Sequence, residues 1–252
     1  MSVDGGGAAP DQDRVRDLAG RLDAVRARIT AAAAAARRSE PELIVVTKYF
    51  PASDARILAG LGVTDLGENR DQEAAAKATE LEDLDVRWHF IGQLQTNKAR
   101  SVVRYASSVH SVDRAPLVAA LGKAMGTEQA RRTAEGLPPR GDLACYLQFT
   151  LDPGATSGRG GALPEEAAGL ATAVAGTTGL RLAGVMAVAP LGAEPADAFA
   201  QLLRIAAVVQ AVDPSATGIS AGMSGDLEAA VAAGATHLRI GSDVLGPRPA
   251  VG

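Results

Sequence analysis

Short apolar runs and amphipathic segments alternate along most of this chain. In the first amphipathic segment, residues 11–38, apolar side chains recur at helical spacing, at Val15, Leu18, Leu22, Val25 and Ile29. Beyond it, apolar runs of strand length alternate with segments of helical period about eight times. The pattern predicts strands at 43–47, 63–66, 86–91, 108–112, 143–151, 180–188, 218–220 and 236–240. It predicts helices at 54–61, 71–84, 97–105, 115–125, 164–176, 195–212 and 226–233. The polar stretch 126–141 is expected to be an exposed loop or an extension of the preceding helix.

This alternation indicates the fold class. Strands that alternate with helices form parallel sheets, and eight such units close into a (β/α)₈ barrel of the TIM type, which typically needs about 250 residues. The chain has 252 residues. We therefore expect an α/β protein with one barrel domain over residues 11–252, an extra N-terminal helix, and a disordered tail at residues 1–10. An open doubly wound sheet is the alternative, and the number of units favours the barrel.

Composition and charge restrict the classes of partner. The net charge is -4 and no long basic run is present, so neither nucleic acid nor a membrane surface is an expected partner. Cys145 is the single cysteine and lies in an apolar run, which suits a buried small side chain. The first residues lack the basic and apolar regions of a signal peptide. We expect a soluble, cytoplasmic protein and assign no residue to a metal site.

Lys48 is the first candidate for chemistry. It follows the first predicted strand, and strand alternation places Ile44, Val46 and Lys48 on one face. If that face lines the barrel, Lys48 lies at the C-terminal mouth, where barrel active sites are found. A lysine near apolar groups has its charged form disfavoured, so its neutral amine can attack an aldehyde. A solvated lysine at a strand end is the alternative for Lys48 taken alone.

Two loops near the C-terminal end suggest a phosphate site. Residues 220–226, Ser-Ala-Gly-Met-Ser-Gly-Asp, follow the seventh predicted strand, and Gly241-Ser242 follow the eighth. TIM barrels frequently bind phosphate between these two loops. Two ordinary turns are the alternative, with Asp226 and Glu228 complementing a helix dipole. Those acids would repel a phosphate unless they point away from it.

Arg239 is the third candidate. Leu238 and Ile240 suit the side of the strand that faces the helices, which turns Arg239 into the barrel together with His237. A buried guanidinium needs a partner. Glu68 is one candidate for that partner, and the nitrogen of a bound pyridine ring is the other.

These residues resemble the pyridoxal phosphate homeostasis proteins, single-domain relatives of the alanine racemase barrel. The matching stretches run in order through nearly all of the chain beyond the first helix, and the string at 89–98 together with the block from 222 to 241 is highly specific. The stretches are Val46-Thr47-Lys48 with Pro51, Gly67-Glu68-Asn69, residues 89–98 (HFIGQLQTNK), residues 184–187 (GVMA), residues 220–234 and Arg239-Ile240-Gly241.

The resemblance implies that pyridoxal 5′-phosphate (PLP) is bound as a Schiff base on Lys48, with Asn69 beside the cofactor. It implies that Arg239 faces the pyridine nitrogen. It also implies phosphate contacts from Ser220, Met223 through its backbone, Ser224, Gly241 and Ser242. The chain departs from the family pattern in three places: Tyr49-Phe50 replaces a smaller pair, Asp243 replaces a small apolar residue, and Arg159-Gly160-Gly161 stands where relatives carry another basic turn, to which we assign no role.

The resemblance favours a carrier over an enzyme. It implies intracellular PLP homeostasis, by buffering PLP or delivering it to apo-forms of PLP-dependent enzymes. An amino-acid racemase is the alternative, but racemisation needs one acid–base group on each face of the cofactor. Alanine racemases take the second group from another domain, and His89 and the three tyrosines are the substitutes considered in this chain. A class I aldolase would explain Lys48 and the phosphate loops but not Arg239.

Overall fold

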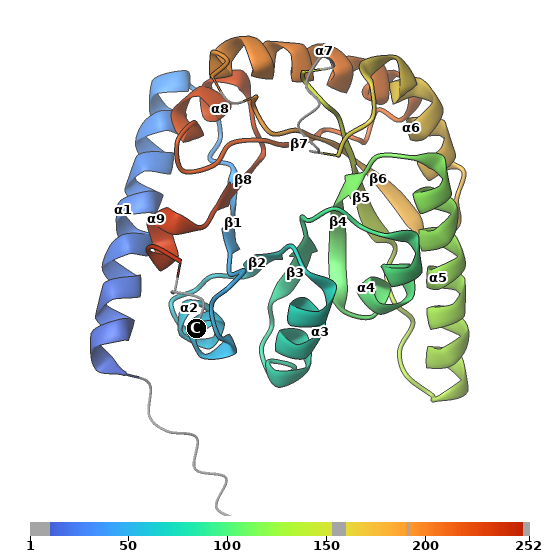
Figure 1. Ribbon diagram of the computed structural model, residues 1–252, viewed down its shortest axis with the longest axis horizontal. Helices are drawn as coiled ribbons and strands as arrows, with labels where there is room; N and C mark the ends of the chain where they lie inside the picture. The colour runs from blue at the N-terminus through green and yellow to red at the C-terminus, as the bar shows by residue number, and fades with distance from the viewer. Residues whose placement is uncertain (1–10, 153–159, 191, 249–252) are drawn as a thin grey trace, which may run out of the picture.

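Eight parallel strands form a closed barrel in which each strand pairs with the next and β8 pairs with β1 (Figure 1). The computed structural model describes residues 11–152, 160–190 and 192–248, so the predicted tail and Arg159 lie outside the described residues. The strands are β1 (Glu42–Val46), β2 (Asp65–Glu68), β3 (Arg87–Phe90), β4 (Ala106–Val112), β5 (Leu143–Gln148), β6 (Leu180–Met186), β7 (Gly218–Ser220) and β8 (His237–Ile240). The predicted (β/α)₈ barrel is confirmed, and the open sheet is excluded.

The helices surround the barrel in chain order (Figure 1). They are α1 (Gln12–Ala36), α2 (Ala52–Gly60), α3 (Asp71–Glu80), α4 (Ala99–Tyr105), α5 (Ala115–Ala134), α6 (Ala167–Ala175), α7 (Pro195–Val212), α8 (Leu227–Ala233) and α9 (Ser242–Leu245), with short 3₁₀ turns at Thr96–Lys98 and Pro164–Glu166. Asp11 caps α1 by accepting the amide of Asp13. The polar stretch after residue 125 continues α5 to Ala134. Of the two alternatives given for this stretch, a loop or a helix extension, the structure shows the extension.

The main core lies between the barrel wall and the helices. Strand alternation divides β1: Val45 packs in that outer core, whereas Ile44 and Val46 lie beside Gly67 of β2 inside the barrel. Leu238 and Ile240 of β8 also pack outward, as predicted. By length and composition α7 could cross a membrane, but its face from Ala198 to Val209 is buried against the barrel. The polar side chains of the site lie at the strand positions that face the inside of the barrel.

The extra helix α1 packs along the outside of the barrel next to α8 and α9 (Figure 1). Its apolar stripe, Leu18, Leu22, Val25, Ile29 and Ala33, is buried. This stripe is the one that the helical spacing predicted. The packing places the polar face of α1 beside the loops that follow β7 and β8.

Candidate functional site

Two neighbouring cavities open at the C-terminal mouth of the barrel. Their volumes are about 630 Å³ and about 280 Å³, and Lys48, Ile91, Met223 and Arg239 line both. The larger cavity extends over the ends of β3, β5 and β6, and the smaller one extends over the loops after β7 and β8. Volumes of this size are typical of small-molecule sites. The structure therefore brings the predicted lysine and arginine to one site.

The backbone that carries Lys48 is fixed on both sides. The Thr47 amide donates to the carbonyl of Gly67 over 3.0 Å, and the Thr47 carbonyl accepts the Lys77 ammonium over 2.8 Å. After Lys48, Tyr49 has a φ of 71°, in the left-handed region that non-glycine residues rarely adopt. Such strain persists only where the surroundings hold it, and it is common at functional sites. The backbone position from which the Lys48 side chain extends is thus set by its neighbours.

Glu68 is the centre of the polar cluster behind this backbone. One of its carboxylate oxygens accepts the Thr47 hydroxyl and the Lys77 ammonium, each over 2.6 Å. Burial raises the pKa of Glu68 above its usual value, and the Lys77 ammonium opposes that effect. The suggested pairing of Glu68 with Arg239 is wrong, because the side chain of Glu68 points to α3 whereas Arg239 points into the barrel.

Arg239 is buried and has two protein acceptors. One terminal nitrogen donates to the Ser220 hydroxyl over 2.6 Å, and the other donates to the carbonyl of Ala187 over 2.9 Å. A guanidinium has five N–H donors, so others remain for the cavities that Arg239 lines. Burial lowers the pKa of Arg239 to about 10, which leaves the group cationic at neutral pH.

The loops after β7 and β8 meet at the smaller cavity. Ser224, Gly225, Gly241 and Ser242 line it, and the hydroxyl oxygens of Ser224 and Ser242 lie 3.3 Å apart. In the part of the chain that the structure describes, the amides of Ser224, Gly225 and Ser242 donate to no protein acceptor. Gly222 makes this turn possible, because its φ is 93° and a Cβ there would meet the side chains of Ala230 and Leu238 at 2.6 and 2.7 Å.

The acidic residues near these loops are turned away or paired. Arg28 of α1 binds Glu228 over 2.9 Å and Asp243 over 2.6 Å, and also donates to the carbonyl of Ser224. Asp226 accepts the amide of Met223 over 2.6 Å. Arg28 thus offsets the repulsion that two of the three carboxylates, Glu228 and Asp243, would exert on a phosphate bound here.

Three predicted residues have surroundings that the sequence did not indicate. The Ser220 side chain lies inside the barrel between Arg239 and His110, and Ser220 does not line either mouth cavity. The Met223 amide, expected to meet a phosphate, is bonded to Asp226. Asn69 lines the larger cavity, and its buried carbonyl oxygen has no partner among the described residues.

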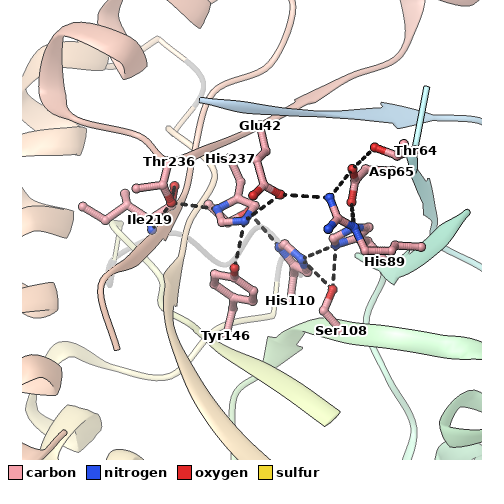
Figure 2. Close-up of polar contacts among 12 residues, drawn as sticks. Glu42, Thr64, Asp65, His89, Ser108, His110, Tyr146, Ile219, Thr236 and His237 are labelled. Atoms are coloured by element: carbon pink, nitrogen blue, oxygen red, sulfur yellow. Dashed lines mark hydrogen bonds and ion pairs between the residues drawn. The ribbon is translucent and has the colours of Figure 1, made fainter. Parts of the chain in front are cut away.

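His110 is the residue that the sequence interpretation missed. It lies inside the barrel with His89 of β3, Tyr146 of β5 and His237 of β8 (Figure 2). The signal was available, because strand alternation from the predicted strand at 108–112 puts Ser108 and His110 on one face. None of the histidines lines either mouth cavity. Within the described ranges, no group of three or more His, Cys, Asp or Glu is placed to hold a metal ion.

Comparison with known proteins gives a consistent result. The family model of the alanine racemase N-terminal domain matches residues 21–249. A pyridoxal phosphate homeostasis protein of Corynebacterium glutamicum is 43% identical over 209 residues, which are 82% of this chain and 90% of that protein. PipY of Synechococcus elongatus, in a structure with PLP bound, is 34% identical with a TM-score of 0.74, over 91% of this chain and 100% of that one.

More distant structures share the barrel alone. An alanine racemase of Corynebacterium glutamicum is 14% identical, with a TM-score of 0.64. The likeness covers 91% of this chain and 60% of the racemase, so a substantial part of the racemase has no counterpart in the match. At this identity the likeness shows the fold and carries no argument about activity.

Proposed function

Since this chain belongs to the family of pyridoxal phosphate homeostasis proteins, we propose that it holds PLP as a Schiff base on Lys48. Its role is to buffer cytoplasmic PLP and deliver it to apo-forms of PLP-dependent enzymes. The observation that carries the proposal is the position of Lys48, which lines both mouth cavities between Arg239 and the loops after β7 and β8.

The residues at the mouth fit PLP. The hydroxyls of Ser224 and Ser242 and the amides of Ser224, Gly225 and Ser242 suit a phosphate, and Gly241 lines the same cavity. The unpartnered oxygen of Asn69 would accept a donor from the ligand. The free N–H groups of Arg239 suit the ring nitrogen. When bound, PLP supplies an aldehyde that condenses with an amine and a ring that withdraws electrons.

Two of the predicted contacts need a qualification. The Met223 amide can reach a phosphate only if it exchanges its bond with Asp226. The side chain of Ser220 points to Arg239 and does not line the phosphate cavity, so we assign it to the ring end of the site.

For the alternative function, an amino-acid racemase, the described residues offer two tyrosines that are held away from the mouth and one that lies at it. The hydroxyl of Tyr146 lies 3.0 Å from His237 inside the barrel, and burial raises its pKa to about 12. The hydroxyl of Tyr105 donates to Asp71, and burial raises its pKa as well. Tyr49 lies at the mouth, with Arg70 and Arg248 over its ring. A cationic Arg239 also discourages protonation of the pyridine nitrogen, which weakens the ring as an electron sink.

Borohydride reduction tests the attachment site. Reduction of the loaded protein should fix PLP on the peptide that contains Lys48, as read by mass spectrometry. Lys48→Ala should abolish the label, whereas Lys123→Ala, an exposed lysine on α5, should leave it unchanged. A label on Lys77, Lys98 or Lys123 would reject the assignment.

A turnover assay separates the carrier from the racemase. The loaded protein is incubated with a panel of L- and D-amino acids and, separately, with the apo-form of a PLP-dependent enzyme. We expect recovery of the enzyme's activity and no racemisation. Turnover of any amino acid at about 1 s⁻¹ or faster would favour the racemase.

A further inference from the structure

All three histidines of the chain lie together inside the barrel (Figure 2), and none of them lines a mouth cavity. His110 is fully enclosed, and its ring stacks on Tyr146 with 4.2 Å between ring centroids. Neither the Schiff base nor the phosphate site uses these histidines. Burying an ionisable group destabilises the fold unless the group is hydrogen-bonded. The hydrogen-bond partners of the histidines therefore indicate the role of these residues.

A row of hydrogen bonds runs from Arg239 through this cluster. Arg239 donates to the Ser220 hydroxyl over 2.6 Å, and Ser220 lies 2.8 Å from Nδ1 of His110. His110 Nε2 lies 3.0 Å from the Ser108 hydroxyl, which lies 2.7 Å from Nδ1 of His89. His89 Nε2 ends the row at the carboxylate of Asp65, over 2.7 Å.

The two ends of the row are fixed, because a guanidinium can only donate and a carboxylate can only accept. Ser220 accepts from Arg239, and the acceptor within reach of its own buried proton is Nδ1 of His110. His110 then carries its proton on Nε2, which lies 3.0 Å from the Ser108 hydroxyl and 3.1 Å from Nδ1 of His89. His89 donates from Nε2 to Asp65.

The surroundings of His110 keep its ring neutral. The groups that face its ring are His89 from β3, Tyr146 from β5, and His237 and Arg239 from β8. None of these groups is an anion, and Asp65 is one histidine further away. Burial, and then the nearby His89, Arg239 and His237, lower the pKa of His110 well below its usual value.

We propose that His110 is a positioning residue for Arg239, acting through Ser220. This inference rests on the proposed function, because its role is to hold the guanidinium where its free N–H groups meet the ring nitrogen of PLP. Neutral His110 takes the proton of Ser220 and leaves the hydroxyl oxygen to accept from Arg239. Its buried surroundings keep His110 in this form at neutral pH.

Three variants separate positioning from general packing. His110→Phe keeps a ring against Tyr146 but removes the acceptor for Ser220. His110→Asn keeps an acceptor close to the position of Nδ1 but does not titrate. His237→Phe is the matched control, because it removes the contacts of His237 with Tyr146 and Thr236 and leaves the row from Arg239 to Asp65 unchanged. The dissociation constant of PLP and the absorption spectrum of the bound cofactor are measured at pH 8 and at pH 6.5.

At pH 8, His110→Phe should weaken PLP binding about tenfold and shift the absorption spectrum, whereas His110→Asn and His237→Phe should stay within about threefold of wild type. The differences among the proteins should be the same at pH 6.5 as at pH 8, because the pKa of His110 lies well below the usual value near 6.5 and the ring stays neutral. Equal affinities of His110→Phe and wild type, or a loss of about tenfold in His110→Asn as well, would overturn the proposal.

Histidine ¹⁵N NMR on the cofactor-free wild type provides a readout that needs no bound PLP. His110 should be neutral with its proton on Nε2, and Ser220→Ala should shift its Nδ1 resonance. A proton on Nδ1 would overturn the inference. Absence of a borohydride-stable adduct on Lys48 would instead reject the proposed function, and the NMR result would still decide the arrangement of the row.

Discussion

The surroundings of Lys48 combine a strained residue with a buried ion pair. A non-glycine residue in the left-handed region costs about 1–2 kcal/mol, and Tyr49 adopts it directly after the lysine. The carbonyl of Thr47 accepts both the Lys77 ammonium and the amide of Phe50. These bonds restrain the peptide in front of Lys48 and compensate for the strain behind it. Thr47 and Lys77, which hold the lysine from behind, do not line the mouth cavities, whereas the strained Tyr49 does.

The ion pair behind Lys48 gives a prediction about stability. Lys77→Met leaves Glu68 buried without its cation, and breaking a buried pair in this way costs about 3–5 kcal/mol. The free energy of unfolding, measured in urea, should fall by that amount. The double variant Lys77→Met with Glu68→Gln should recover a large part of the loss, because it leaves no buried charge. Lys123→Met, on the exposed face of α5, is the control and should change stability by less than about 0.5 kcal/mol.

At the residue scale, strand alternation was the most informative sequence signal. It placed Lys48 at the mouth and turned Arg239 into the barrel, and both predictions agree with the structure. It could not identify the partners of Arg239, because Ser220 and Ala187 come from the ends of two other strands. Glu68 was misassigned for the same reason, since its partner Lys77 lies on a helix. Pairings between distant elements depend on strand register, which the local sequence does not contain.

Helix α1 completes the loops that follow β7 and β8. Arg28 makes the contact between α1 and these loops, since it binds the carboxylates of Glu228 and Asp243 and the carbonyl of Ser224. A helix outside the eight repeating units thereby controls the charge at the proposed phosphate site. The sequence predicted α1 from its apolar stripe but gave no indication of this second role, because the contacts span about 200 residues.

Arg28→Ala should weaken PLP binding more than the binding of pyridoxal, which has no phosphate. The physical reason is that Glu228 and Asp243 would lose their cation and repel the phosphate. Both dissociation constants can be measured by absorbance titration, and we expect a loss of about fivefold or more for PLP only. Arg26→Ala is the matched control on the same helix, because Arg26 contacts the carbonyls of Leu61 and Gly62. An equal loss for both ligands would point to distortion of the whole site instead.

Element boundaries were less predictable than element types. The second strand was predicted at 63–66 and is found at Asp65–Glu68. The difference arises because pairing with β1 and β3 sets its ends, and the apolar Val63 packs in the core without joining the sheet. The short helix α9 was not predicted, since four residues carry no periodic signal.

At the scale of the whole molecule, the buried histidines predict loss of stability in acid. Burial is the main factor that lowers the pKa of His237 to about 4, and it lowers that of His110 as well. The unfolded chain takes up these protons near pH 6.5 and the folded chain takes them up only at lower pH. Stability therefore falls as the pH falls from about 6.5 to about 4. Asp65, whose pKa is lowered overall, adds a further loss only below its usual range.

The size of this effect can be measured by urea unfolding at a series of pH values. For His237 alone the shift corresponds to a loss of about 3 kcal/mol between pH 6.5 and pH 4. His237→Phe should show a shallower dependence on pH than wild type, while Arg26→Ala should keep the slope of wild type. A free energy of unfolding that stays constant from pH 7 to pH 5 would contradict the expectation.

The position of α1 against α8 and α9 also has a consequence for the order of folding. The helix leaves the ribosome before the barrel, but α8 and α9, which pack against it, are made only when the barrel is nearly complete. Pairing of β1 with β8 spans a similar distance along the chain. Contacts of such long range form slowly, so a partly synthesised chain keeps the stripe of α1 exposed and cannot yet assemble the site. We therefore expect cofactor loading to begin only after translation has passed β8, and nascent chains to depend on chaperones that cover α1 until then.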